Sequence, residues 1–158
     1  MLVAGVALLG VMAIPAAQLQ LGLPDGGNEP PNSSAYKSYT MIDKAFGAGA
    51  NGPIIVVADF PEPVAEADQS ARKVEIGREI KAIPGAEQVV PIGVSKDQKT
   101  MAFQVVSAAG PSSKETLFLV HAIRDGVKKT FAKQDIEIGV TGATVANIEI
   151  SDTLSKAL

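Results

Sequence analysis

Cysteine and tryptophan are absent from this 158-residue sequence, and histidine occurs once, as His121. The lack of cysteine excludes thiol nucleophiles, zinc–cysteine sites and disulfide frameworks together. The aromatic residues are five phenylalanines and two tyrosines, too few for a stacking platform that binds bases or sugars. Lysine and arginine are not clustered and the formal net charge is −3, which argues against a nucleic-acid-binding surface.

Charge is missing altogether from residues 1–24, and the first charged residue is Asp25. The opening stretch MLVAGVALLGVMAIPAA is almost wholly apolar, and LQLGL extends it. No basic residues precede it, as they would in a secretory signal, and it has no polar face for a soluble helix. A membrane span needs about 20 such residues. We therefore predict that residues 1–22 are the end of a transmembrane helix and that the chain is part of a larger protein.

Residues 23–52 are predicted to form a linker and a short amphipathic helix. The stretch LPDGGNEPPNSS is rich in proline and glycine and is typical of turns. Asn32 and Ser33 are candidate N-caps, and Gly47 occupies the position of a C-terminal helix glycine. The apolar residues at helical spacing are Ala35, Tyr39, Ile42 and Phe46.

The remainder of the chain predicts four strands and three helices. Strands are expected at 53–58, 86–94, 100–107 and 135–140, and helices at 64–82, from Ser112–Ser113 to about Phe131, and at 144–158. The first strand is a continuous apolar run, as in the centre of a sheet. In the second helix the predicted buried face is Val120, Ile123, Val127 and Phe131. In the 64–82 helix two diverging stripes leave the buried face open: Ala67, Ala71 and Val74, or Ile76, Ile80 and Ile83.

This β-α-β-β-α-β order predicts an α+β fold of the ferredoxin-like, split βαβ type. We expect helices on one face of a four-stranded, mainly antiparallel sheet, with the first and third strands central and the fourth at an edge. The predicted domain covers 53–142, and 143–158 is a C-terminal helix that leads to the next membrane span.

A glycine pattern, G-x-G-x-x-G, is formed by Gly47, Gly49 and Gly52. In dinucleotide-binding proteins a strand precedes such glycines and a helix follows, so that the helix N-terminus meets the pyrophosphate. Here a helix is predicted before the glycines and a strand after them, and the C-terminal end of a helix dipole repels phosphate. The pattern therefore does not predict a nucleotide site.

No other group of residues predicts catalysis, a cofactor or a metal. Ser112 and Glu115 have capping-box spacing, which accounts for Ser112 without chemistry. His121 lacks an accompanying nucleophile and is interpreted as solvated or partner-facing. The acidic residues Glu62, Glu66 and Asp68 are interpreted as acids near a helix N-terminus. We therefore expect the chain not to be an enzyme, with no catalytic, cofactor-binding or metal-binding residue, and its substrate-binding residues stay unknown.

Two stretches resemble the MMPL family of RND-superfamily exporters. LQLGLPDGG followed by SYTMIDKAFGAGANGPIIVVAD is similar to the family's segment that leaves a membrane helix. TGATVANIEISDTLSKAL is similar to the element that leads into the next one, with Asp152 matching and with departures at Val145–Ala146 and Glu149. The resemblance is closest to the second of the two extracytoplasmic domains.

The resemblance implies a proton-driven exporter of lipids or hydrophobic drugs in the plasma membrane, with this domain on the extracytoplasmic side. Implied partners are the rest of the transporter, above all its other extracytoplasmic domain, the membrane and the substrate. The family's proton-relay residues lie in membrane helices that this sequence does not contain, so none is assigned. Two alternatives stay open: a free-standing, membrane-tethered ferredoxin-like module for ligand binding or regulation, and a small enzyme that uses His121.

Overall fold

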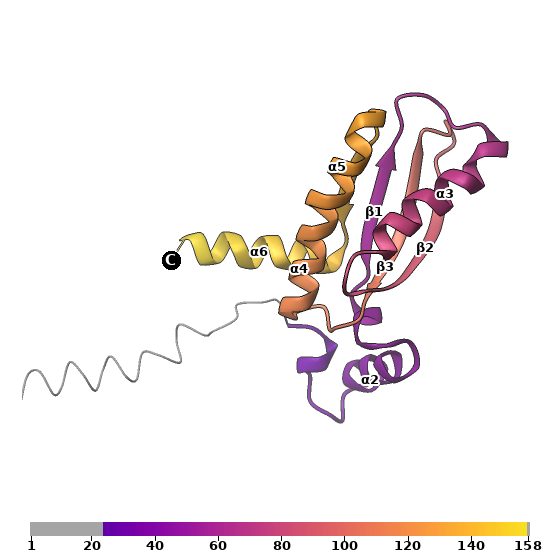
Figure 1. Ribbon diagram of the computed structural model, residues 1–158. Coiled ribbons are helices and arrows are strands. Elements are labelled where there is room, and N and C mark those ends of the chain that lie inside the picture. Colours follow the sequence, from indigo (N-terminus) through magenta and orange to yellow (C-terminus); the bar gives the residue numbers. More distant parts are fainter. Residues whose placement is uncertain (1–23, 158) are drawn as a thin grey trace, which may run out of the picture.

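The computed structural model describes residues 24–157, which form a four-stranded sheet and the helices around it (Figure 1). The strands are β1 (Ile54–Asp59), β2 (Ala86–Val94), β3 (Thr100–Ser107) and β4 (Glu137–Thr141). The helices are α2 (Ser34–Phe46), α3 (Glu66–Lys81), α4 (Lys114–Ala122), α5 (Lys128–Phe131) and α6 (Ala143–Ala157). Shorter turns are η2 (Gly26–Asn28), η3 (Ala48–Asn51), η4 (Ile123–Val127) and η5 (Ala132–Gln134).

The predicted transmembrane segment 1–22 lies outside the described residues. Within 24–157, none of the helices combines the length and the hydropathy that a membrane span requires.

All strand pairs in the sheet are antiparallel, and the strand order is β2-β3-β1-β4. This confirms the predicted α+β fold, and the first and third strands are central as expected. Val56 in β1 lies opposite Phe103 in β3 and Val140 in β4, which aligns the apolar positions of three strands. The strands β2 and β3 form a hairpin, because they pair directly across a short polar turn.

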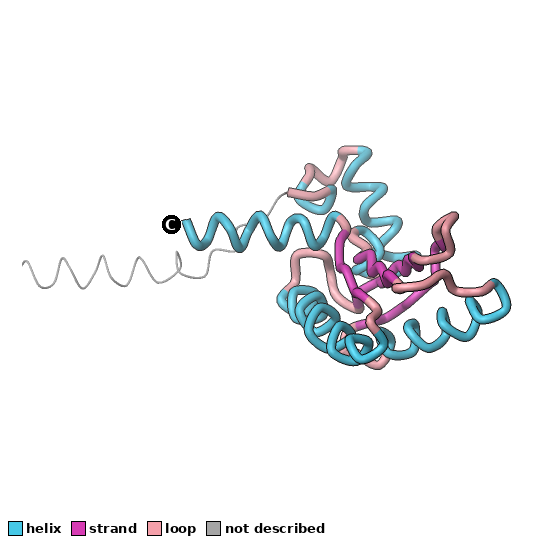
Figure 2. The backbone as a smooth tube through the Cα atoms, turned by 90° about the horizontal axis from the view of Figure 1, so that it is seen from above, coloured by secondary structure: helices cyan, strands magenta, loops and turns pink. Residues whose placement is uncertain are grey.

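One face of the sheet is covered by α3 and by the α4–α5 segment (Figure 2). On this face Ile54, Val56 and Ala58 of β1 are completely buried. From α3, Ile76 and Ile80 are completely buried, whereas Val74 is 58% exposed. Of the two stripes left open by the sequence, the isoleucine stripe therefore faces the core.

The segment from α4 to α5 is one continuous helical stretch with a π-helical turn, η4, in its middle. A π-turn inserts one extra residue per turn and so shifts the register of the helix faces. The predicted buried face is nevertheless confirmed, because one residue of each turn reaches the core. The buried apolar residues of this segment are Leu119, Val120, Ile123, Val127 and Phe131.

The helix α4 begins one residue later than predicted. Ser113, not Ser112, is the N-cap, and its hydroxyl oxygen accepts a hydrogen bond of 3.1 Å from the Thr116 backbone N–H. The predicted capping box between Ser112 and Glu115 is therefore wrong, because Glu115 occupies the second helical position instead of the third. Ser112 is exposed.

The helix α2 has the predicted ends but not the predicted buried stripe. Ser33 caps its start by accepting from the Tyr36 backbone N–H at 3.1 Å, and Gly47 ends it with a φ of 92°. No residue of α2 is buried, and Ile42 and Phe46 are 39% and 66% exposed. Tyr39 is of intermediate burial and lies against Gly26 and Gly27 of η2, so only part of the predicted stripe is covered.

Candidate functional site

The glycine motif forms a tight loop between α2 and β1 that two other parts of the chain contact. Gly49 is buried, and a Cβ atom placed on it would lie 2.1 Å from the backbone oxygen of Ser107. A Cβ on Gly52 would lie 2.4 Å from Thr144 Oγ1 and 2.6 Å from the ring of Pro111. Both positions therefore require glycine because another part of the chain lies against the backbone.

The same loop ties the start of β1 to the start of α6. The Thr144 hydroxyl, which is buried, donates a hydrogen bond of 2.6 Å to the Gly52 carbonyl oxygen. Gly142 has a φ of 117°, and a Cβ there would lie 2.8 Å from the Pro53 oxygen. The glycine loop follows the helix α2 and precedes the strand β1, whereas a dinucleotide-binding loop follows a strand and precedes a helix. The glycines serve packing.

The other residues considered from the sequence are not brought together. His121 is exposed on α4, and the Ser113 hydroxyl is used in the helix cap. Glu66 and Asp68 lie in the first turn of α3, as predicted for acids near a helix N-terminus. Across residues 24–157, no group of three or more histidine or acidic side chains is arranged to hold a metal ion.

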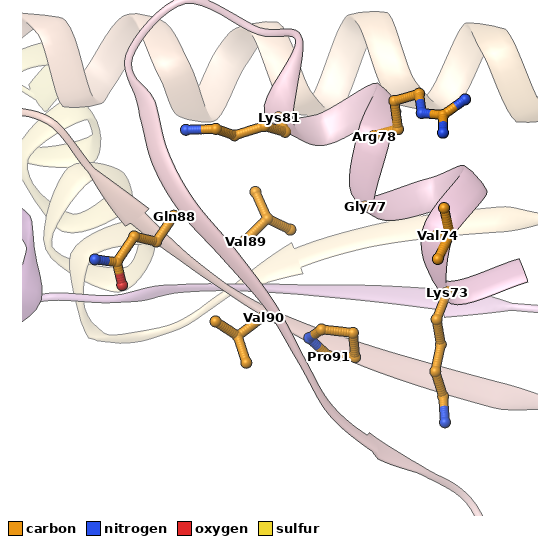
Figure 3. Close-up of a pocket in the computed structure, with 9 residues that line it drawn as sticks. All are labelled: Lys73, Val74, Gly77, Arg78, Lys81, Gln88, Val89, Val90 and Pro91. Atoms are coloured by element: carbon orange, nitrogen blue, oxygen red, sulfur yellow. The ribbon is translucent and has the colours of Figure 1, made fainter. Parts of the chain in front are cut away.

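An open groove of about 590 Å³ lies between α3 and the edge strand β2, and we call it the α3–β2 groove (Figure 3). Its lining residues are Lys73, Val74, Gly77, Arg78 and Lys81 from α3, and Gln88, Val89, Val90 and Pro91 from β2. None of the sequence patterns described above predicts this groove. Gly77 leaves the helix side open, because a Cβ at this position would meet only Val89 Cγ1, at 4.0 Å. A glycine in the middle of a predicted helix is the sequence signal that could have indicated it.

The apolar part of the α3–β2 groove is accessible to solvent. Val74 is 58% exposed and Val90 is 48% exposed, which is high for valine. Ile92, next along β2, is 50% exposed. It lies at an irregularity between Pro91 and Gly93, where the strand register shifts. Val90 pairs with Gln104 in β3 and therefore lies on the face of the sheet opposite α3, whereas Val74 lies on the α3 side.

The charged residues that line the groove are all cationic. Lys81 Nζ donates to the backbone oxygens of Ala86, at 2.9 Å, and Glu87, which holds its ammonium group over the start of β2. Lys73 and Arg78 form no salt bridge with any residue in 24–157. No carboxylate is among the lining residues.

A second groove, of about 560 Å³, lies at the other end of α3 and is acidic. Glu62, Asp68 and Glu75 contribute carboxylates to its lining. Arg72 Nη1 donates to Glu75 Oε2 at 2.8 Å and to Gln134 Oε1 at 2.9 Å, which joins α3 to η5. The arginine is thus already paired, and the groove presents no free cation for a ligand.

The face of the sheet opposite α3 and α4–α5 is only partly covered. Ile55 and Val57 in β1 and Ala102 and Gln104 in β3 alternate with the core residues and are of intermediate burial. The register places Ile55 opposite Gln104 and Val57 opposite Ala102, so the four side chains are neighbours. We call them the open sheet face.

Comparison with known proteins places the sequence among membrane proteins. The model of the MMPL family matches residues 29–158. A curated relative, "Membrane protein YdfJ" of Bacillus subtilis (strain 168), is 34% identical over 159 aligned residues. The alignment covers 99% of this chain but only 21% of that protein. The chain thus spans about a fifth of the length of this relative.

Proposed function

Because the chain belongs to the MMPL family, we propose that it is the extracytoplasmic porter domain of a proton-driven exporter of lipids or hydrophobic drugs. The domain itself is non-enzymatic: it provides part of the substrate path and packs against the transporter's other extracytoplasmic domain. Its fold is the ferredoxin-like fold that the resemblance implies for such domains. The low coverage of YdfJ agrees with a domain of a larger membrane protein.

The observation that supports this role is the open sheet face. Sheets with one covered face and one partly apolar face bury the second face against another layer. Ile55 and Val57 are too apolar to favour solvent, and the described helices α3 and α4–α5 cover only the opposite side. A second domain of the same transporter would complete the layer.

The side of the membrane is tested by cysteine labelling, since this chain has no cysteine of its own. Lys96 is exposed in the turn between β2 and β3, and Lys96→Cys is introduced into the full-length protein. Any cysteines elsewhere in that protein are first replaced by serine. A membrane-impermeant maleimide is expected to label the variant in intact cells. Labelling that occurs only after permeabilisation would place the domain on the cytoplasmic side and refute the proposal.

The interdomain contact is tested on the open sheet face. Ala102→Lys in the full-length protein places a charge on this face and is expected to lower efflux of the hydrophobic dye Nile red from energised cells. Ala132→Lys is the matched control, because Ala132 is exposed in η5, away from this face. Efflux that ceases with a protonophore supports proton coupling. Equal efflux by wild type, both variants and cells without the gene would contradict the proposal.

The two alternatives make different predictions. A free-standing module requires a parent reading frame with no further hydrophobic spans, whereas the exporter requires several on both sides of this domain. An enzyme that uses His121 requires His121→Ala to abolish the activity. We expect His121→Ala to leave dye efflux unchanged, because the side chain is exposed and no nucleophile accompanies it.

A further inference from the structure

We propose that Arg124 and Glu149 form a latch that sets the direction in which α6 leaves the domain and so positions this helix for transport. The two side chains form a salt bridge between η4 and α6. The other salt bridge found among residues 24–157 lies within α3, between Arg72 and Glu75. The inference rests on the proposed function and deepens it, because α6 is the expected connection to the next membrane span.

The first turn of α6 is anchored in the domain. Thr144 and Val145 are buried, and the Thr144 hydroxyl donates to the Gly52 carbonyl oxygen. Ile148, one turn further along, is partly buried against the core. Leu154 is 51% exposed, and this later part of α6 extends away from the sheet in both views (Figure 1, Figure 2). Apolar packing therefore fixes where α6 begins but leaves its far half without such support in the described part of the chain.

Glu149 lies at the border between the packed part and the projecting part of α6. It follows the buried Val145 by four residues and therefore lies one turn beyond it on the same helix side. Arg124 follows the buried Ile123 and contacts Glu149 from the π-helical turn η4. The ion pair thus holds α6 from the side, about 7.5 Å along the helix axis from the anchor at Thr144.

The contact between Arg124 and Glu149 can open without unfolding the domain. The Arg124 side chain is 34% exposed and the Glu149 side chain is 57% exposed. Exposed ion pairs contribute little to folding stability, so their loss leaves the buried core intact. Because Leu154 lies about 15 Å beyond Thr144 along the axis, a pivot of about 20° around the first turn displaces it by about 5 Å.

The test measures the direction of α6 by double electron–electron resonance in the full-length protein in lipid nanodiscs. Any cysteines elsewhere in that protein are replaced by serine, and spin labels are attached at Lys129→Cys in α5 and Leu154→Cys in α6, both exposed positions. We expect a narrow distance distribution when the latch is intact. With Arg124→Gln added, the distribution is expected to broaden or shift by about 5 Å. The control pair, Lys129→Cys with Ala146→Cys, reports the anchored first turn and is expected to stay unchanged.

Two further variants separate the ion pair from general effects on the fold. Arg124→Glu/Glu149→Arg exchanges the two charges and is expected to restore the narrow distribution. Glu149→Lys places two cations together at an exposed position, so it opens the contact even if Arg124→Gln does not fold. An unchanged distribution in both single variants would overturn the proposal. Equal broadening in the Ala146→Cys control pair would also overturn it, because the anchor of α6 would then depend on the same ion pair.

The role in transport is measured separately, by Nile red efflux without spin labels. Arg124→Gln is expected to lower the maximal efflux rate at least about threefold, without changing the dye concentration that gives half the maximal rate. Lys128→Gln removes a neighbouring exposed cation and is expected to leave efflux unchanged. Wild-type efflux by Arg124→Gln would overturn the role of the latch in transport. Absence of efflux from the unaltered protein would instead refute the exporter, and the distance measurement would still decide whether the pair positions α6.

Discussion

Replacing Gly49 with alanine tests whether the glycine motif is a packing device. The new Cβ would lie 2.1 Å from the Ser107 oxygen and 2.7 Å from the Ser107 nitrogen, whereas ordinary contact begins at 3.4 Å. One of the two backbones must therefore move by more than an ångström. Neither is free to do so, since Ser107 pairs with Ala86 at the end of β3. The Ser107 hydroxyl also forms a buried hydrogen bond of 2.7 Å with that of Thr116.

The expected loss of stability follows from these two contacts. Overpacking costs typically 1–3 kcal/mol, and a buried polar group left without its partner costs a similar amount. We expect Gly49→Ala to lose about 3 kcal/mol in all. For a chain of this size that corresponds to a fall in Tm of about 6–12 °C. Urea and thermal unfolding of the 158-residue chain in dodecyl maltoside, followed by circular dichroism, measure both quantities.

Gly139→Ala is the matched control. Gly139 is exposed on the edge strand β4, and a Cβ there would meet no atom within 4 Å. Its unfolding free energy is expected to change by less than about 0.5 kcal/mol. Equal stability of Gly49→Ala and Gly139→Ala would refute the view that the loop is held by close backbone contact.

Three further predictions concern the helices and the pH dependence. Ser113→Ala is expected to lower the free energy of unfolding in urea by about 1 kcal/mol through loss of the N-cap, and Ser112→Ala by less than about 0.5 kcal/mol. A larger loss for Ser112→Ala than for Ser113→Ala would indicate that Ser112 caps the helix, as in the capping box predicted from the sequence. Gly77→Ala is expected to raise the free energy of unfolding by up to about 1 kcal/mol, because the new Cβ has room and alanine favours the helix more than glycine does. A lower free energy of unfolding would indicate that β2 lies closer to Gly77 and that the groove is closed. Burial raises the pKa of Tyr39, and the nearby carboxylates of Asp25 and Asp43 raise it further. The neutral phenol is therefore favoured in the folded protein, and its contribution to folding stability is complete below a pH of about 10. This contribution is lost as the pH rises through the raised pKa of the folded state. Absorbance titration of Tyr36→Phe, which leaves Tyr39 as the one tyrosine, checks this, and a midpoint at or below that of N-acetyltyrosinamide would contradict it.

Strong periodicity is what made the sheet and the helices predictable. The alternation of Ile136, Ile138 and Val140 placed β4 with one covered face, and the apolar run at 54–58 identified a central strand. Each of these signals repeats over several residues and reports burial directly. The start of α4 was missed by one residue because Ser112 and Ser113 are both suitable caps, and the choice depends on where the buried Thr116 has to lie.

The surfaces outside the core could not be predicted in the same way. Ile42 and Phe46 have helical spacing, but spacing alone cannot say whether a neighbour covers them. The α3–β2 groove depends on how a helix and a strand pack after the hairpin has formed. Its cations, Lys73, Arg78 and Lys81, are ordinary solvated residues when the sequence is read along the chain. The position of the glycine motif between a helix and a strand was predicted correctly, because both neighbouring elements have clear sequence signals.

The hydrogen bond from Thr144 to the Gly52 carbonyl oxygen joins residues 92 positions apart. Everything between them, including all four strands, forms a closed loop of chain whose two ends meet at one point. Such a unit can be moved between hosts as a cassette, because a short linker on each side replaces the original connections without stretching the sheet. The unit extends slightly beyond these two residues, because Gly49 packs against Ser107 and Val145 is buried in the core.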